Sequence, residues 1–111
     1  MQNKYKLPSD VRRVAIGIVQ GQDRRIRNKH SGNINNNESV LIESVSNALN
    51  EVCADIQSSE LKHDLKSALI QNCVNKSNVY EHFCLPGISR KSFYNRKNRM
   101  LYLIAKVNNI I

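Results

Sequence analysis

The sequence has no tryptophan and only six other aromatic residues, four Tyr and two Phe, among its 111 residues. RNA-recognition domains of the RNP type stack bases on an aromatic platform, so this scarcity disfavours RNA binding. No apolar run approaches the ~18 consecutive residues of a membrane span. The first residues are not followed by the apolar core of a signal peptide. We therefore expect a cytoplasmic protein that does not interact with a membrane.

Cysteine is also scarce, and its spacing carries no chemical motif. Cys53, Cys73 and Cys84 are odd in number and widely separated, with no CxxC pair and no His at ligand spacing. These features argue against a disulfide framework and against a zinc site. Cys53 and Cys73 fall on the apolar phases of helical patterns, where a free thiol behaves as a small hydrophobic group. We expect both to pack in the core, and we expect no metal and no cofactor.

Catalytic motifs are lacking as well. His30, His63 and His82 are scattered, and Asp and Glu do not cluster with them. The sequence contains no Gly-rich phosphate loop and no nucleophile motif. We therefore predict that the protein is not an enzyme.

Charge is abundant, and the two signs are segregated along the chain. Residues 1–30 hold eight Lys and Arg against two Asp, a balance of +6. Residues 31–84 hold three basic against seven acidic residues, and residues 85–111 hold six basic and no acidic residues. Such segregation suggests that the two basic ends form a polyanion-facing surface, while the acidic middle keeps the protein soluble. The alternative is that the basic side chains only solvate two helices.

The hydrophobic periodicity is helical almost throughout, so we predict an all-α protein of about five helices in a single domain, residues 1–111. The apolar stripes predict helices at residues 9–29, 38–56 and about 60–75. Gly17 and Gly21 weaken the first of these and favour a bend there. Residues 31–37 combine Gly32 with four asparagines, which favours a loop.

The last third of the chain has the pattern of a helix-turn-helix, which we assign to residues 77–110. Residues 77–83 carry a cap and an apolar pair, enough for a short first helix. Pro86 then interrupts the pattern, and Gly87 permits the positive φ of a sharp turn. Ser89 is the expected N-cap of a basic amphipathic helix, and Ile88 and Phe93 are spaced to form a hydrophobic staple.

That last helix presents two different faces at 100° per residue. We expect its core face to hold Phe93, Met100, Ile104, Val107 and Ile111, widened by Leu101. No acidic residue occurs from Gly87 onward, so the cations of the opposite face have no partner on their own helix. Lys and Arg neutralise phosphates, and Arg and Asn read guanine and adenine edges, so double-stranded DNA is the expected partner. The candidate DNA-binding residues are Ser89, Arg90, Lys91, Tyr94, Asn95, Arg96, Asn98 and Arg99.

These candidates are expected to differ in role. Arg90, Lys91, Tyr94, Asn95 and Asn98 are predicted to face the groove, with packing on the helix pair as the alternative role of Tyr94. Arg96 and Arg99, together with Lys97, fit phosphate contacts or solvated charges as well as they fit base reading.

The run Gly87-Ile88-Ser89-Arg90-Lys91-Ser92-Phe93-Tyr94, with the basic residues and apolar helix that follow, resembles the C-terminal signature of the RinA/ArpU-type phage transcriptional regulators. The resemblance covers roughly residues 77–107 and implies a helix-turn-helix similar to region 4 of sigma factors. It also implies a prophage-encoded activator of late or packaging genes. RNA polymerase and a second copy of the chain are then further candidate partners.

A different class of function uses the same motif for assembly. A small DNA-packaging subunit, similar to those of terminases, would hold phage DNA within a ring. The oligomeric state distinguishes the two classes, because a ring favours packaging and a monomer or dimer favours regulation.

Overall fold

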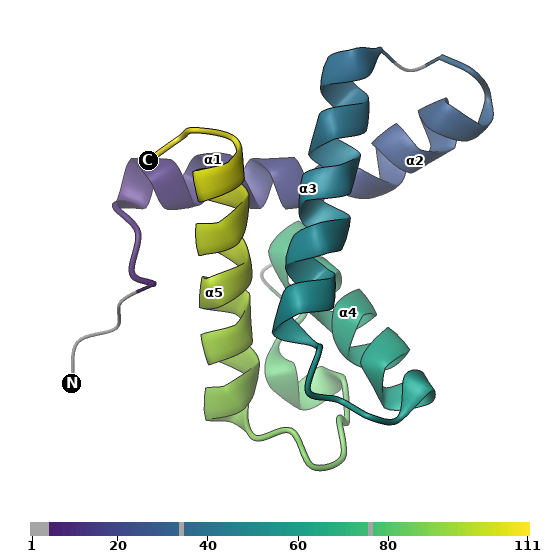
Figure 1. Cartoon of the computed structure of the whole chain (residues 1–111). Helices are drawn as coiled ribbons and strands as arrows, with labels where there is room; N and C mark the ends of the chain where they lie inside the picture. Colours follow the sequence, from purple (N-terminus) through teal and green to yellow (C-terminus); the bar gives the residue numbers. More distant parts are fainter. Residues whose placement is uncertain (1–4, 34, 76) are drawn as a thin grey trace.

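All regular secondary structure in the described part of the chain is helical. The computed structural model describes residues 5–33, 35–75 and 77–111, and Figure 1 shows its elements. The prediction of a small all-α domain with about five helices is confirmed. The elements are α1 (Ser9–Gln20), α2 (Gln22–His30), α3 (Asn36–Val52), α4 (Ser59–Val74), the 3₁₀ turn η1 (Tyr80–His82) and α5 (Arg90–Val107).

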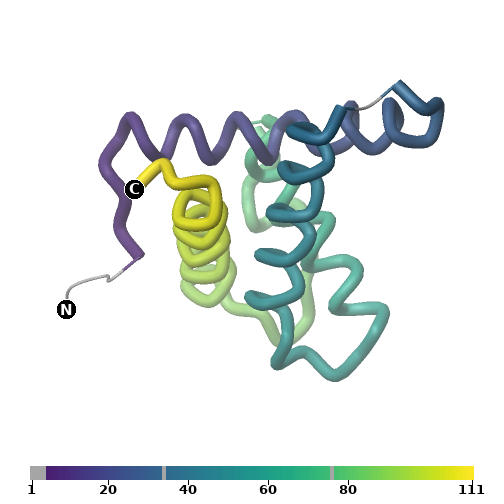
Figure 2. Tube along the Cα trace, turned by 45° about the horizontal axis from the view of Figure 1, so that its top comes forward, coloured from purple at the N-terminus to yellow at the C-terminus, as the bar shows by residue number. Residues whose placement is uncertain are grey.

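The C-terminal helix α5 is central to the packing. It contacts α3 and α1, while α4 packs against α1 and α2 packs against α3. Figures 1 and 2 both show α1 lying across the C-terminal end of α5 and passing α3, with α2 continuing beyond it beside the first part of α3. One face of α5 is therefore covered by two helices that lie far from it in the sequence.

The hydrophobic core lies between α1, α3, α4 and α5. Cys53 and Cys73 are buried in it, as their helical phase predicts, whereas Cys84 is exposed. Burial raises the pKa of both core thiols, so they stay protonated and apolar. The largest fully buried side chains are Phe93, Leu65, Leu69, Met100, Leu101, Ile104, Val19, Val45 and Cys53.

Side-chain caps set the starts of three helices. The Ser89 hydroxyl accepts from the Ser92 N–H, so the predicted Ser89 cap is confirmed, and the Ser58 hydroxyl caps α4 by accepting from the Leu61 N–H. Asn35 caps α3 in the same way, which moves the start of this helix two residues before the expected Glu38. The helix also ends at Val52, and Ile56, expected in its last turn, is buried from the following loop instead.

The helix expected over residues 9–29 is divided at Gly21 into α1 and α2. The buried Arg25 side chain folds back here, and its Nη1 donates to the Ile18 carbonyl at 2.5 Å. A Cβ on residue 21 would lie 2.7 Å from the Arg25 Nη2 atom, so glycine leaves the space that the guanidinium occupies. Arg25 thereby satisfies a carbonyl in the last turn of α1, where a cation suits the helix dipole.

The short first helix predicted for residues 77–83 is wrong. Only Tyr80–His82 form a helical turn, η1, so the described residues between α4 and α5 contain no second full helix. Asparagine side chains account for the difference, because they bind the backbone groups that a helix needs. Asn72 Nδ2 donates to the Asn78 carbonyl at 2.7 Å, and Asn78 Nδ2 donates to the Gln71 carbonyl at 3.1 Å. The helix-turn-helix is therefore reduced to a 3₁₀ turn followed by α5.

Aromatic packing holds this link against α5. The Phe93 ring lies 5.6 Å from the ring of Tyr80, 5.8 Å from that of Phe83 and 5.2 Å from that of Tyr94, measured between centroids. The Tyr80 hydroxyl donates to the Ile88 carbonyl. Gly87 has φ +76°, as predicted, so the chain reverses just before the Ser89 cap.

The expected core face of α5 is correct in its middle and wrong at its end. Phe93, Met100, Leu101 and Ile104 are buried, and Ala105 joins them. Val107 is 62% exposed and Ile111 is 52% exposed. The reason is that α5 ends at Val107, so the helical phase no longer places Ile111.

Replacing Phe93 with Ala should destabilise the fold by about 3–5 kcal/mol, because Phe93 is fully buried among three other aromatic rings. Urea unfolding of the variant measures the loss. Asn95→Ala, an exposed position on the same helix, is the matched control and should leave the unfolding midpoint unchanged. Equal midpoints for Phe93→Ala and the wild type would contradict the assigned packing.

Candidate nucleic-acid interface

The N-terminal turn of α5 is built to face an anion. Ser89 sits at the N-cap, and its hydroxyl accepts the Ser92 N–H at 3.0 Å. The N–H groups of the next two residues have no partner inside an α-helix and point out of its positive end. No acidic residue lies in this first turn. A phosphate can therefore approach the end of the helix without meeting a negative charge on the helix itself.

Four of the predicted residues lie together in the first two turns of α5 and are called the α5 stripe: Arg90, Lys91, Tyr94 and Asn95. Lys91 and Asn95 are exposed and have no polar partner within the described residues. Tyr94 is half-buried, and its ring packs edge-on against Phe93. The Arg90 guanidinium lies 5.3 Å from the centre of the Tyr94 ring. The α5 stripe is thus anchored by an aromatic ring and open to solvent.

Arg90 also forms an ion pair within the protein. Its Nη1 lies 2.6 Å from Glu81 Oε1, and the two side chains are 67% and 51% exposed. Ion pairs at such exposed positions contribute about 0–1 kcal/mol. A stronger anion can therefore replace Glu81 at little energetic cost, and Arg90 remains available to a ligand.

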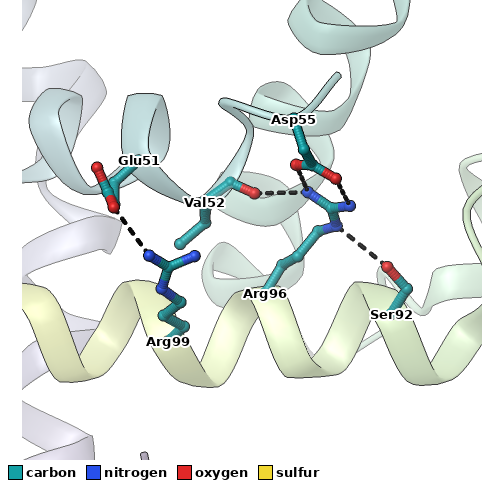
Figure 3. A network of polar contacts seen from close by, with 6 residues as sticks. All are labelled: Glu51, Val52, Asp55, Ser92, Arg96 and Arg99. Carbon is teal, nitrogen blue, oxygen red and sulfur yellow. Dashed lines mark hydrogen bonds and ion pairs between the residues drawn. The ribbon is translucent and has the colours of Figure 1, made fainter. Parts of the chain in front are cut away.

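Arg96 is held inside the protein, in contrast to its predicted role. Its guanidinium binds both carboxylate oxygens of Asp55 at 2.7 Å and donates to the Val52 carbonyl at 2.6 Å (Figure 3). Its Nε donates to the Ser92 hydroxyl at 3.1 Å. The Arg96 side chain is only 16% exposed. These contacts join α5 to the end of α3 and argue against Arg96 as a DNA contact.

Asn98 and Arg99 are likewise occupied by neighbouring helices. The Asn98 Oδ1 atom accepts from Arg12 Nη1 of α1 at 2.8 Å. Arg99 Nη2 lies 2.8 Å from Glu51 Oε1 of α3, as Figure 3 shows. Asn98 is therefore assigned to helix packing, as a correction to its expected place in a DNA surface. Arg99 follows Asn95 by four residues and lies on the same side of α5, where its ion pair with Glu51 is at the surface, with side chains 38% and 58% exposed.

The acidic middle of the chain thus has a structural role in addition to solubility. Its Glu51, Asp55 and Glu81 pair with three of the six cations of residues 85–111. Burial lowers the pKa of a fourth, Lys97, which is half-buried. Lys91 and Lys106 remain exposed and unpaired within the described residues. The unpaired charge of α5 is therefore much smaller than the sequence suggests.

A second set of cations, on α2, was not among the candidate residues. Arg24, Arg27 and Lys29 are exposed and have no side-chain partner in the described ranges. The only sequence signal for them is the +6 balance of residues 1–30. That signal could not distinguish exposed arginines from arginines that bind within the protein. Arg12 and Arg25 of the same region are of the second kind.

Comparisons with protein-family models, with curated proteins and with solved structures gave no match to this chain. The resemblance to the RinA/ArpU-type regulators therefore stays a prediction. No group of three or more His, Cys, Asp or Glu in the described residues could hold a metal ion. No helix within those residues is long and apolar enough to cross a membrane.

The Arg96–Asp55 pair predicts a specific dependence of stability on pH. Hydrogen bonding from Arg96 lowers the pKa of Asp55 from 3.8 to about 2. A depressed carboxyl pKa stabilises the fold above about pH 4, and this stabilisation is lost as pH falls toward 2. Asp55 is 65% exposed, so the contribution is about 1 kcal/mol or less.

Asp55→Asn should therefore be less stable than the wild type at pH 6, and the difference should shrink between pH 4 and pH 2. Urea unfolding of both proteins at several pH values measures it. Glu60→Gln, an exposed acidic position in the first turn of α4, serves as the control. A difference between Asp55→Asn and wild type that is independent of pH would show that the ion pair does not contribute.

Proposed function

We propose that this protein binds double-stranded DNA through the α5 stripe and acts as a sequence-specific transcriptional regulator. The observation that carries the proposal is the asymmetry of α5. Its apolar face is buried in the core, while Arg90, Lys91 and Asn95 stay exposed at its N-terminal end. A recognition helix in the major groove has this geometry: its apolar side packs on the protein, and its N-terminal end is polar and cationic.

Each residue of the α5 stripe has a chemical role in this proposal. Lys91 is a flexible point charge suited to phosphate, and Arg90 exchanges Glu81 for a phosphate oxygen. Asn95 can form two hydrogen bonds with the N6 and N7 edge of adenine. Tyr94 supports Arg90 from its ring face. Lys106, farther along α5, is suited only to backbone phosphate or solvent.

The biological setting rests on the resemblance in residues 77–107. It makes the protein a prophage-encoded activator of late or packaging genes, acting in the cytoplasm where its DNA and RNA polymerase are present. A homodimer would place two α5 stripes on a two-fold symmetric site. Sedimentation of the protein with and without DNA separates a monomer or dimer, expected for a regulator, from the ring of a packaging subunit.

Selection of bound duplexes from a random library tests the proposal directly. A regulator should enrich one short motif, and its affinity for that motif should fall as salt is raised. Failure to bind any duplex at low salt, or binding with no enriched motif, would contradict a sequence-specific regulator.

Asn95→Ala should weaken binding to the selected duplex by about 1–3 kcal/mol and leave binding to a scrambled duplex nearly unchanged, because Asn95 is assigned to base edges. Lys91→Ala should weaken both duplexes alike and reduce the slope of log K against log salt by about 1. Fluorescence anisotropy titrations at three salt concentrations measure both effects. An Asn95 variant that weakens the two duplexes equally would remove this residue from sequence reading.

A further inference from the structure

The helix α2 carries an exposed cationic face with no assigned role. Arg24, Arg27 and Lys29 are exposed, and Asp23 is the only acidic residue of the helix. Arg24 and Arg27 are three residues apart, so they are neighbours on one side of the helix. Lys29 follows the buried Arg25 by four residues, so it lies on another side of the helix. We call Arg24 and Arg27 the α2 face.

The lack of partners on the α2 face contrasts with the rest of the protein. Every ion pair among the described residues joins an arginine of α5 to a carboxylate of the acidic middle. None of the cations of the α2 face has an ion pair or a side-chain hydrogen bond there. Like charges on adjacent turns repel one another, which destabilises an isolated helix slightly. A polyanion would remove that repulsion.

The orientation of α2 is fixed by its polar inner side. The Gln22 amide donates to the Ile42 carbonyl of α3 at 3.2 Å, and Arg25 donates to the Ile18 carbonyl of α1. Both side chains are buried. Because two of its neighbours hold α2 from one side, its outer side chains are presented in a defined direction. The exposed arginines are therefore not the ends of a free tail.

The α2 face is separate from the α5 stripe. Figures 1 and 2 both show α2 continuing from the C-terminal end of α1, away from the N-terminal end of α5. One compact protein thus has two separate cationic regions. The α5 stripe has an exposed Asn and a Tyr suited to base reading, whereas Asn28, four residues after Arg24, is half-buried and the α2 face has no Tyr beside it. The composition of the α2 face suits a uniform array of phosphates.

We infer that the α2 face is a second DNA-binding surface that contacts the phosphate backbone of a duplex without reading its sequence. The inference rests on the proposed function, because it assumes that duplex DNA is the polyanion. Arg24 and Arg27 supply planar donors that match phosphate oxygens. The contact adds affinity and salt dependence, while the α5 stripe supplies the preference for one sequence.

The test compares two double variants that remove the same charge from different helices. Arg24→Gln/Arg27→Gln removes two cations of the α2 face, and Lys62→Gln/Lys66→Gln removes two cations from α4. Circular dichroism and unfolding check that each variant is folded. Each protein is titrated with the selected duplex and with a scrambled duplex at three or more salt concentrations.

The α2 variant should lose affinity several-fold for both duplexes and reduce the slope of log K against log salt by about 2, while the ratio of the two affinities stays constant. The α4 variant should keep the wild-type slope. Equal effects of the two variants would show a general effect of net charge and overturn the inference, as would an α2 variant that behaves like the wild type.

The same titrations separate this inference from the proposed function. Loss of salt dependence in the α2 variant, together with wild-type behaviour of Lys91→Ala and Asn95→Ala, would support the α2 face and contradict the role of the α5 stripe. If the wild type prefers the selected duplex and the α2 variant binds as the wild type does, the result would support the α5 stripe and contradict the α2 face. A wild-type protein that binds no duplex at low salt would overturn both.

Discussion

The buried apolar face of α5 holds this helix on the rest of the protein, and the two hydrogen bonds between Arg96 and Asp55 add a directional contact to it. The apolar face of a helix decides which side is buried, but apolar contacts alone allow a helix to rotate or slide by a fraction of a turn. The Arg96 fork also reaches the Val52 carbonyl, so one side chain ties α5 to the last turn of α3 and to the following loop. With that position set, Lys91 and Asn95 are left on the open side of α5.

Local signals in the sequence predicted the features that depend on a few neighbouring residues. The cap at Ser89, the positive φ of Gly87 and the burial of Phe93 all follow from short-range geometry. The partners of Arg96, Arg99 and Asn98 could not be predicted, because they lie 41, 48 and 86 residues away in the chain. The candidate site was therefore too large, since cations that serve packing have the same local pattern as cations that serve binding.

The two basic ends of the chain carry equal formal charge, but the fold pairs their cations with acidic residues to different extents. Three of the six cations at the C-terminal end pair with Glu51, Asp55 and Glu81, while the exposed cations of α2 have no such partners in the described residues. The difference arises from topology, because α5 packs beside α3, which carries Glu51, and beside the loop that holds Asp55. Charge segregation in the sequence thus overstates the binding surface where the fold brings the opposite charges together.

The polar inner side of α2 has a consequence for the local stability of the molecule. The only fully buried side chains of α2 are Gln22 and Arg25, so the hydrophobic effect contributes little to its docking. Its free energy of opening should therefore lie well below that of global unfolding, and its amide hydrogens should exchange with solvent through local opening. By contrast, the amides of α5 near Met100 and Ile104 should exchange only when the whole domain unfolds. We therefore expect α2 to exchange its amide hydrogens sooner than the core helices, although it is docked in a defined orientation in the folded domain.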